Sequence, residues 1–227
     1  MLYCILNKAA YSMKWILSFI SIFYCSVLFS QTSAISVTGV SPLAAYSEKW
    51  NELKYNACNT AVVSSYMSRK EKEVIYILNL VRTNPALFAK TVLKKYPSVS
   101  GKDYLTDDVY YYKSLVDTLL TLKPQQLFYP DEKCWRSAQC HAYSSGLSGY
   151  IGHQRKTKIC KTKKNYQGEC CDYGNADPLD IVLSLLIDEG VPSLGHRYLL
   201  LNSYSKAGVS IQPHKKYGTN TVIDFYY

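Results

Sequence analysis

One stretch of the chain combines two acids, Asp188 and Glu189, with a Gly-Val-Pro turn and a histidine that follows a second glycine, His196. A histidine and an acid of the same kind lie upstream, at His153 and Glu169. These side chains are the first candidates for a functional site, because imidazole and carboxylate groups bind metals and transfer protons.

Several kinds of chemistry suit these residue types. Neutral imidazoles and carboxylates are good ligands for zinc, copper or manganese and need not be adjacent in sequence. A catalytic zinc leaves one position for water, which an acid can deprotonate as general base. No His-Glu-x-x-His motif occurs in the sequence. A histidine–acid pair could also act in general acid–base catalysis, or simply hydrogen-bond two loops together. The sequence leaves these alternatives open.

Nucleophilic catalysis has little support. Ser193 and Ser203 lie near the candidate residues but lack the Gly-x-Ser-x-Gly pattern of an activated serine.

The remaining histidines have structural interpretations. His141 lies close to alanines in an expected helix and is interpreted as a core histidine. His214 is interpreted as a turn residue between two strands.

The N-terminus has the features of a secretory signal peptide over residues 1–30, with cleavage after Ser30 or Ala34. Lys14 directly precedes an apolar run of about 16 residues, shorter than the roughly 20 that a membrane-spanning helix needs. Met13 begins a better signal than Met1. We therefore expect a secreted protein with no stable membrane span after cleavage, and an uncleaved anchor is the alternative.

Cysteine usage fits an exported protein. An even number of cysteines follows the signal peptide, which is typical of disulfides. These disulfide candidates are Cys58, Cys134, Cys140, Cys160, Cys170 and Cys171. No Cys-x-x-Cys pair occurs, so a zinc–thiolate site is not indicated. Cys134 and Cys140 share one expected helix, too far apart along it to bond to each other.

Composition and charge place the chain among globular proteins. It is 48% hydrophobic and 19% charged, which suits a packed core. The net charge of +9 favours anionic surfaces. No zinc-finger, helix-turn-helix or RNA-binding motif occurs, so nucleic acid is not an expected partner. Residues 155–164 are rich in arginine and lysine, and we interpret them as a solvated loop rather than an anion site.

Hydrophobic periodicity predicts helices with strands at the C-terminal end. Helices are expected to begin near Glu71, at Asn84–Pro85, near Val109, after Asp131 and at Asp177–Pro178. Asn84, Asp131 and Asp177 have the side chains of N-caps. A loop is expected over residues 97–102. Alternating residues predict strands at Gly208–Ile211 and Thr221–Phe225, around a turn at Tyr217–Gly218.

Short motifs in this order resemble the CAP superfamily, which includes cysteine-rich secretory proteins, insect venom antigens and plant pathogenesis-related proteins. The resemblance covers about Glu71 to Phe225 and is closest to bacterial-style, SCP-like extracellular domains. It rests on Asn79–Pro85, Ala138–Ala142, His153, Gly168–Glu169, Ile187–Ser193, Gly195–Arg197, Gly208–Val209, His214 and Val222–Phe225. Residues 31–68 would then be a lead-in, and residues 69–227 the CAP domain.

The resemblance implies an α+β fold, an α-β-α sandwich with a small antiparallel sheet between helices. It also implies a cleft with two histidines and two acids: His153, Glu169, Asp188 and His196, with Glu189 as the alternative to Asp188. The chain departs from the family pattern at Cys170 and Leu199, where the family usually has asparagine.

Three functions compete at this stage. The preferred one is an extracellular binding module for a lipid or sterol, a surface polymer or a protein. The second is a metal-dependent hydrolase or peptidase that uses zinc or copper at the histidine–acid cluster. The third is a structural secreted protein with a vestigial cluster. The two departures from the family pattern favour the first and third functions over the second.

Overall fold

Buried aromatic and aliphatic side chains from along the chain form the hydrophobic core. A computed structural model describes residues 39–227, so the expected signal peptide lies outside the described residues. Residues 39–68, expected as a lead-in, share this core, because Leu43, Trp50 and Tyr55 are fully buried with Val74 and Phe225. Within residues 39–227, no helix combines the length and hydrophobicity needed to cross a lipid bilayer.

All the elements before Tyr129 are helical, and the short strands occur among the helices that follow. In chain order they are η1 (Glu48–Asn51), η2 (Leu53–Cys58), α1 (Arg69–Thr83), α2 (Pro85–Phe88), η3 (Ala89–Leu93, a π-helical turn), α3 (Lys94–Ser100), α4 (Tyr110–Thr121), β1 (Tyr129–Pro130), α5 (Glu132–Ser148), α6 (Lys158–Thr162), β2 (Gly168–Tyr173), α7 (Pro178–Ile187), α8 (Gly195–Leu200), β3 (Lys206–His214) and β4 (Gly218–Tyr226).

The expected N-caps are confirmed. The side chain of Asn84 accepts a hydrogen bond from the backbone N–H of Leu87, and Asp177 caps α7 with Pro178 in the first turn. Asp131 caps α5 in the same way. These side chains satisfy N–H groups that have no partner inside their helices. At the other end of α5, Gly149 adopts the left-handed conformation at φ 70°, which glycine accepts without steric cost.

The loop expected at residues 97–102 is wrong for residues 97–100, because α3 continues through Pro97 to Ser100. A proline inside a helix leaves the carbonyl four residues earlier without its N–H donor. Here that carbonyl belongs to Leu93, and the hydroxyl of Tyr112 on α4 donates a hydrogen bond to it. A tertiary contact therefore compensates for the proline and keeps the segment helical.

The sheet has four strands in the order β1-β3-β4-β2. The two expected C-terminal strands are confirmed as the β3–β4 hairpin, and β4 pairs antiparallel with β2. Strand β1 pairs parallel with β3, so the expected antiparallel arrangement holds for β3, β4 and β2 but not for β1. Strand β2 was not predicted at all. Its register places Glu169 directly opposite Asp224, and this pairing builds part of the site.

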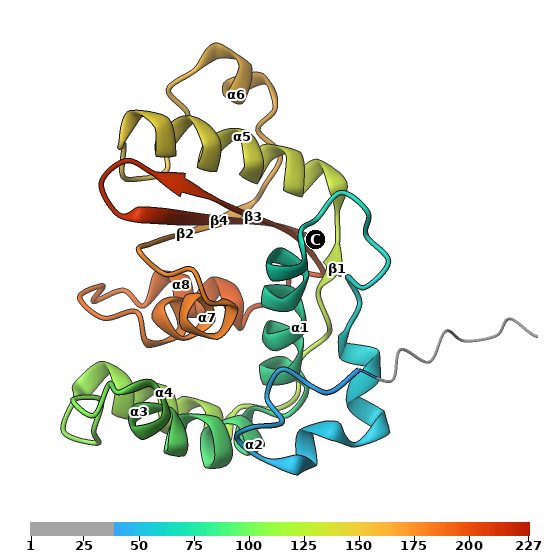
Figure 1. The fold of residues 1–227 in the computed structure, drawn as a ribbon, viewed down its shortest axis with the longest axis vertical. Coiled ribbons are helices and arrows are strands. Elements are labelled where there is room, and N and C mark those ends of the chain that lie inside the picture. The colour runs from blue at the N-terminus through green and yellow to red at the C-terminus, as the bar shows by residue number, and fades with distance from the viewer. Residues whose placement is uncertain (1–38) are drawn as a thin grey trace, which may run out of the picture. The chain divides into compact units, whose positions relative to one another are not determined.

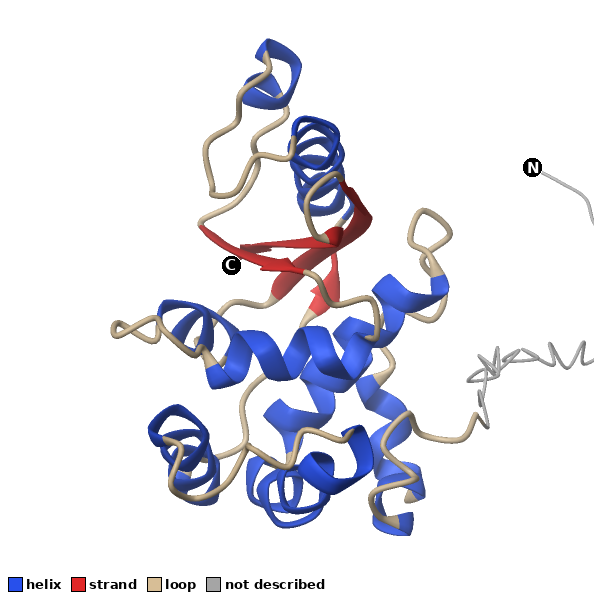
Figure 2. Ribbon diagram, turned by 60° about the vertical axis from the view of Figure 1, so that its left-hand side comes forward, coloured by secondary structure: helices blue, strands red, loops and turns tan. Residues whose placement is uncertain are grey.

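Helices cover both faces of the sheet. Helix α5 packs against β3 and β4 on one face, and α1, α7 and α8 contact the strands on the other (Figure 1). Figure 2, turned by 60°, shows most of the helices gathered on the side of the strands away from α5. The structure therefore belongs to the α+β class, as expected.

The contact between α5 and the sheet depends on a missing side chain. A Cβ atom at Gly208 on β3 would lie 2.0 Å from the backbone nitrogen of Trp135. Glycine at this position lets the backbone of the strand approach the backbone of the helix. The helix that carries His141 is thereby held close against the strands that carry Glu169 and Asp224.

Candidate functional site

His153 and Glu169 form the first histidine–acid pair. His153 lies in the loop after α5, and its Nδ1 is 2.9 Å from Oε1 of Glu169 on β2. The Glu169 side chain is 2% exposed, whereas that of His153 is 54% exposed. The buried carboxylate therefore orients an imidazole ring whose other side faces solvent.

Asp188 and His196 form the second pair. Asp188 ends α7 in the left-handed conformation, at φ 58°. One of its oxygens accepts the backbone N–H of His196 at 2.9 Å, and the other lies 2.7 Å from Nδ1 of the same residue. One carboxylate thus caps the start of α8 and orients the histidine ring. Asp188 is buried and Glu189 is exposed, so Asp188 is the acid of this pair.

The two pairs lie side by side. The ring centroids of His153 and His196 are 6.4 Å apart, and both rings line one cleft of about 390 Å³. Each ring uses Nδ1 toward its carboxylate, which leaves Nε2 to contact a ligand. Histidines that bind metals usually hold their other nitrogen in this way. The four residues selected from the sequence are therefore brought together.

A buried arginine joins Glu169 to a second acid. Arg155 forms an ion pair with Glu169, and its Nη2 lies 3.2 Å from Oδ2 of Asp224. Burial alone would raise the pKa of Glu169, but the hydrogen bond from His153 and the charge of Arg155 outweigh it and lower that pKa. Burial, and then the negative charge of Glu169, raise the pKa of Asp224 well above its usual value.

The basic segment of residues 155–164 contains exposed lysines and one buried arginine. Its lysines are exposed, as expected of a solvated loop, but Arg155 is buried at 4% exposure. The interpretation as a solvated loop is therefore wrong for Arg155. An arginine is suited to this position because its guanidinium group can donate to two carboxylates at once. Sequence inspection missed both Arg155 and its partner Asp224.

The disulfide expectation is correct for only one pair. Cys140 on α5 bonds to Cys160 on α6. The other cysteines in the described part of the chain are buried free thiols, namely Cys58, Cys134, Cys170 and Cys171. Each is enclosed by the core rather than placed opposite another cysteine, so burial accounts for them without a bond.

One of the free thiols lies beside the first histidine. Sγ of Cys171 is 3.6 Å from Nδ1 of His153, an arrangement that resembles a cysteine–histidine catalytic pair. Such catalysis needs a thiolate, which requires a lowered pKa. Burial, and then the charge of Glu169, instead raise the pKa of Cys171 well above its usual value. Cys171 is therefore a neutral thiol and a poor nucleophile.

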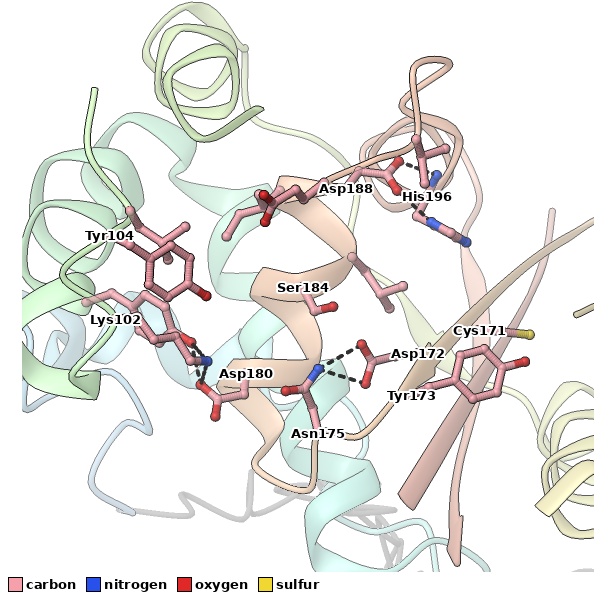
Figure 3. Close-up of a pocket in the computed structure, with 16 residues that line it drawn as sticks. Lys102, Tyr104, Cys171, Asp172, Tyr173, Asn175, Asp180, Ser184, Asp188 and His196 are labelled. Carbon is pink, nitrogen blue, oxygen red and sulfur yellow. Dashed lines mark hydrogen bonds and ion pairs between the residues drawn. The ribbon is translucent and has the colours of Figure 1, made fainter. Parts of the chain in front are cut away.

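A larger groove meets the cleft at His196. Its volume is about 430 Å³, and it runs from Asp188 and His196 toward Lys102, Tyr104 and Asp180 (Figure 3). Nζ of Lys102 lies 3.2 Å from a carboxylate oxygen of Asp180. The groove is thus lined by charged groups and hydroxyls rather than by an apolar surface.

Comparisons of the chain with models of protein families, with curated proteins and with solved structures found no match. The functional assignment therefore rests on the geometry and on the motifs in the sequence.

Proposed function

We propose that this chain is a secreted binding module of the CAP type that holds an extracellular ligand in the groove beside His153 and His196. The order of the CAP-like motifs supports this assignment. An α+β fold with helices on both faces of a small sheet is compatible with the α-β-α sandwich that the resemblance implies.

The observation that carries the proposal is the composition of the groove. Polar groups line its larger part, which extends from Asp188 toward Lys102, and an exposed tyrosine lies in each of its two parts: Tyr104 at 64% exposure and Tyr198 at 66% exposure. Tyrosine combines an apolar ring face with a hydroxyl group. The sugar units of a surface polymer offer hydroxyl groups together with apolar ring faces. We therefore favour a surface polysaccharide over a lipid, since an apolar ligand would need an apolar lining.

Co-sedimentation with insoluble chitin, β-glucan and peptidoglycan tests the proposal. Tyr104→Ala and Tyr198→Ala should each weaken binding to one of these polymers by about tenfold, the usual value of an aromatic contact. His153→Ala and His196→Ala should retain binding, because the contacts are spread along the groove. Tyr143→Ala, an exposed tyrosine on α5, is the matched control. Binding to sterol vesicles but to no polymer would contradict the proposal.

The second candidate is a metal-dependent hydrolase, which the paired carboxylates favour. The residues fit zinc or copper, because Nδ1 of each histidine is held by an acid and Nε2 of each ring remains for the ion. A bound zinc would supply an acidic water molecule and polarise a carbonyl. In this case His153→Ala and His196→Ala would abolish both turnover and metal content. Metal analysis and peptide hydrolysis assays of the same variants separate the two functions.

A further inference from the structure

Behind the cleft, a second group of potential ligands is enclosed between α5 and β2. Ligand atoms of His141, Glu169 and Cys171 all lie within 4.8 Å of one another, and all three residues are buried. Glu169 and Cys171 are alternate residues of β2, so their side chains project from the same face of the sheet. His141 reaches them from α5, which packs on that face.

One ring nitrogen of His141 has no hydrogen-bond partner among the described residues. Its Nε2 lies 2.8 Å from the carbonyl oxygen of Gly152, so Nε2 carries the proton and donates it. Nδ1 is fully buried and has no hydrogen-bond partner within residues 39–227. A neutral imidazole whose N–H donates to a backbone carbonyl is the usual state of a metal-bound histidine.

His153 lies outside this group but contacts two of its members, so a movement of its exposed ring toward His141 would complete the set. Zinc bonds are about 2.0–2.1 Å long to nitrogen and about 2.3 Å long to sulfur. At a tetrahedral angle, a nitrogen and a sulfur bound to the same zinc ion are therefore about 3.6 Å apart. Nδ1 of His153 lies 3.6 Å from Sγ of Cys171. When both residues bind the ion, the 2.9 Å distance between Nδ1 of His153 and Oε1 of Glu169 would increase to about 3.3 Å.

We propose that His141, Glu169 and Cys171 bind a zinc-class divalent ion, with Nδ1 of His153 as the fourth ligand. The ion displaces the thiol proton of Cys171 and the Nδ1 proton of His153, both of which leave to solvent, and Nε2 of His153 takes up one proton from solvent in return. Four protein ligands leave no open position, so this is a structural site rather than a catalytic one. It ties α5, β2 and the loop of His153 together. Its ligands include a thiolate, and His196 is not among them.

Cobalt(II) is the probe, because a cobalt–thiolate bond gives a charge-transfer absorption that imidazole and carboxylate ligands do not. The full secreted chain should bind one equivalent of cobalt with this band, and zinc should displace it. Cys171→Ser should abolish the band, and His141→Gln should weaken binding by about 100-fold or more. Cys58→Ser removes a buried thiol elsewhere and should leave the band unchanged.

A second measurement uses the unaltered protein, so it does not depend on the folding of a variant. One equivalent of zinc should protect Cys171 from alkylation during brief partial denaturation, whereas Cys58 should be labelled equally with and without zinc. Cobalt bound without the thiolate band, or no bound metal, would overturn the proposal. The first of these outcomes would point to Nε2 of the two cleft histidines. Polymer binding through Tyr104 is measured separately, so the proposed function can fail while this site stands.

Discussion

At the scale of single residues, the site is a cluster of charged and histidine side chains, and only some of them can be predicted from the sequence. His153, Glu169, Asp188 and His196 could be predicted because their chemistry and motif order identify them. Arg155 could not, because it stands among lysines that are all exposed, and only its buried contacts with two acids distinguish it. His141 was correctly expected to be buried, but its unpartnered nitrogen depends on a loop carbonyl brought close by folding.

Replacing Arg155 tests how much the cluster contributes to stability. Arg155→Ala leaves Glu169 and Asp224 buried without a positive partner, which typically costs about 3–5 kcal/mol. Urea unfolding of the purified protein measures this loss. Lys156→Ala, at the exposed neighbouring position, should change the free energy of unfolding by less than about 0.5 kcal/mol. A loss as small as that for Arg155→Ala would show that the ion pairs are not formed.

Thiol labelling tests the cysteine assignment. Burial, and then the negative charge of Asp131, raise the pKa of Cys134 to about 12, and burial also raises the pKa of Cys58. Because only the thiolate is alkylated, the native protein should label slowly at both positions at pH 8 and faster as the pH rises. After denaturation without reductant, mass spectrometry should find both residues labelled and Cys140 and Cys160 unlabelled. Three disulfides, as the cysteine count suggests, would leave both thiols unlabelled in that experiment.

At the scale of elements, the sequence predicts helix starts better than it predicts strands. Caps such as Asn84 and Asp177 act within one turn, so their signals are local. The helix through Pro97 could not be predicted, because its compensating hydroxyl comes from Tyr112 on another helix. Strand β2 was missed because Glu169-Cys170-Cys171-Asp172 shows no alternation of apolar and polar residues, although all four side chains become buried.

Asp188 joins two elements, and its replacement should affect both. Asp188→Ala loses the hydrogen bonds to His196 and places alanine at φ 58°, which together should cost about 3 kcal/mol. Asp188→Asn accepts the left-handed conformation and keeps one acceptor oxygen, so its loss should be about 1 kcal/mol. Thermal and urea unfolding measure both values. Glu189→Ala, at the adjacent exposed position, is the control. Equal losses for the two Asp188 variants would contradict this role for the carboxylate.

At the scale of the whole described chain, the main hydrophobic core includes residues from Leu43 to Phe225, a smaller cluster lies between α5 and the sheet, and the single disulfide lies outside both. Composition alone predicts a packed globule, and the α+β class was expected from the resemblance to the CAP superfamily. Composition could not predict that residues 39–68 join the core, because their pattern is mixed. Nor could cysteine counting predict one bond instead of three, since a buried thiol and a bonded one look alike in sequence.

The disulfide closes the segment that carries His153 and Arg155. Cys140 and Cys160 are 20 residues apart, and a loop of this length predicts a stabilisation of about 3 kcal/mol from reduced chain entropy. The double variant Cys140→Ala, Cys160→Ala should lose about this much free energy of unfolding. Hydrogen exchange should also increase within residues 149–165. An unchanged exchange rate there would show that the ion pairs of Arg155 hold the segment without the disulfide.

The order of residues in β2 has a consequence for folding accuracy. Each face of β2 carries one acid and one cysteine from the run Glu169-Cys170-Cys171-Asp172. If the strand shifted its register by one residue, each face would therefore still carry one acid and one cysteine. Gly168 disfavours that shift, because a Cβ atom there would lie 2.8 Å from the side chain of Leu199 and 3.1 Å from the ring of Tyr204. Either neighbour of Gly168 in its place would force these side chains to move. The absence of a side chain at Gly168 thus favours the strand register in which Glu169 pairs with Arg155.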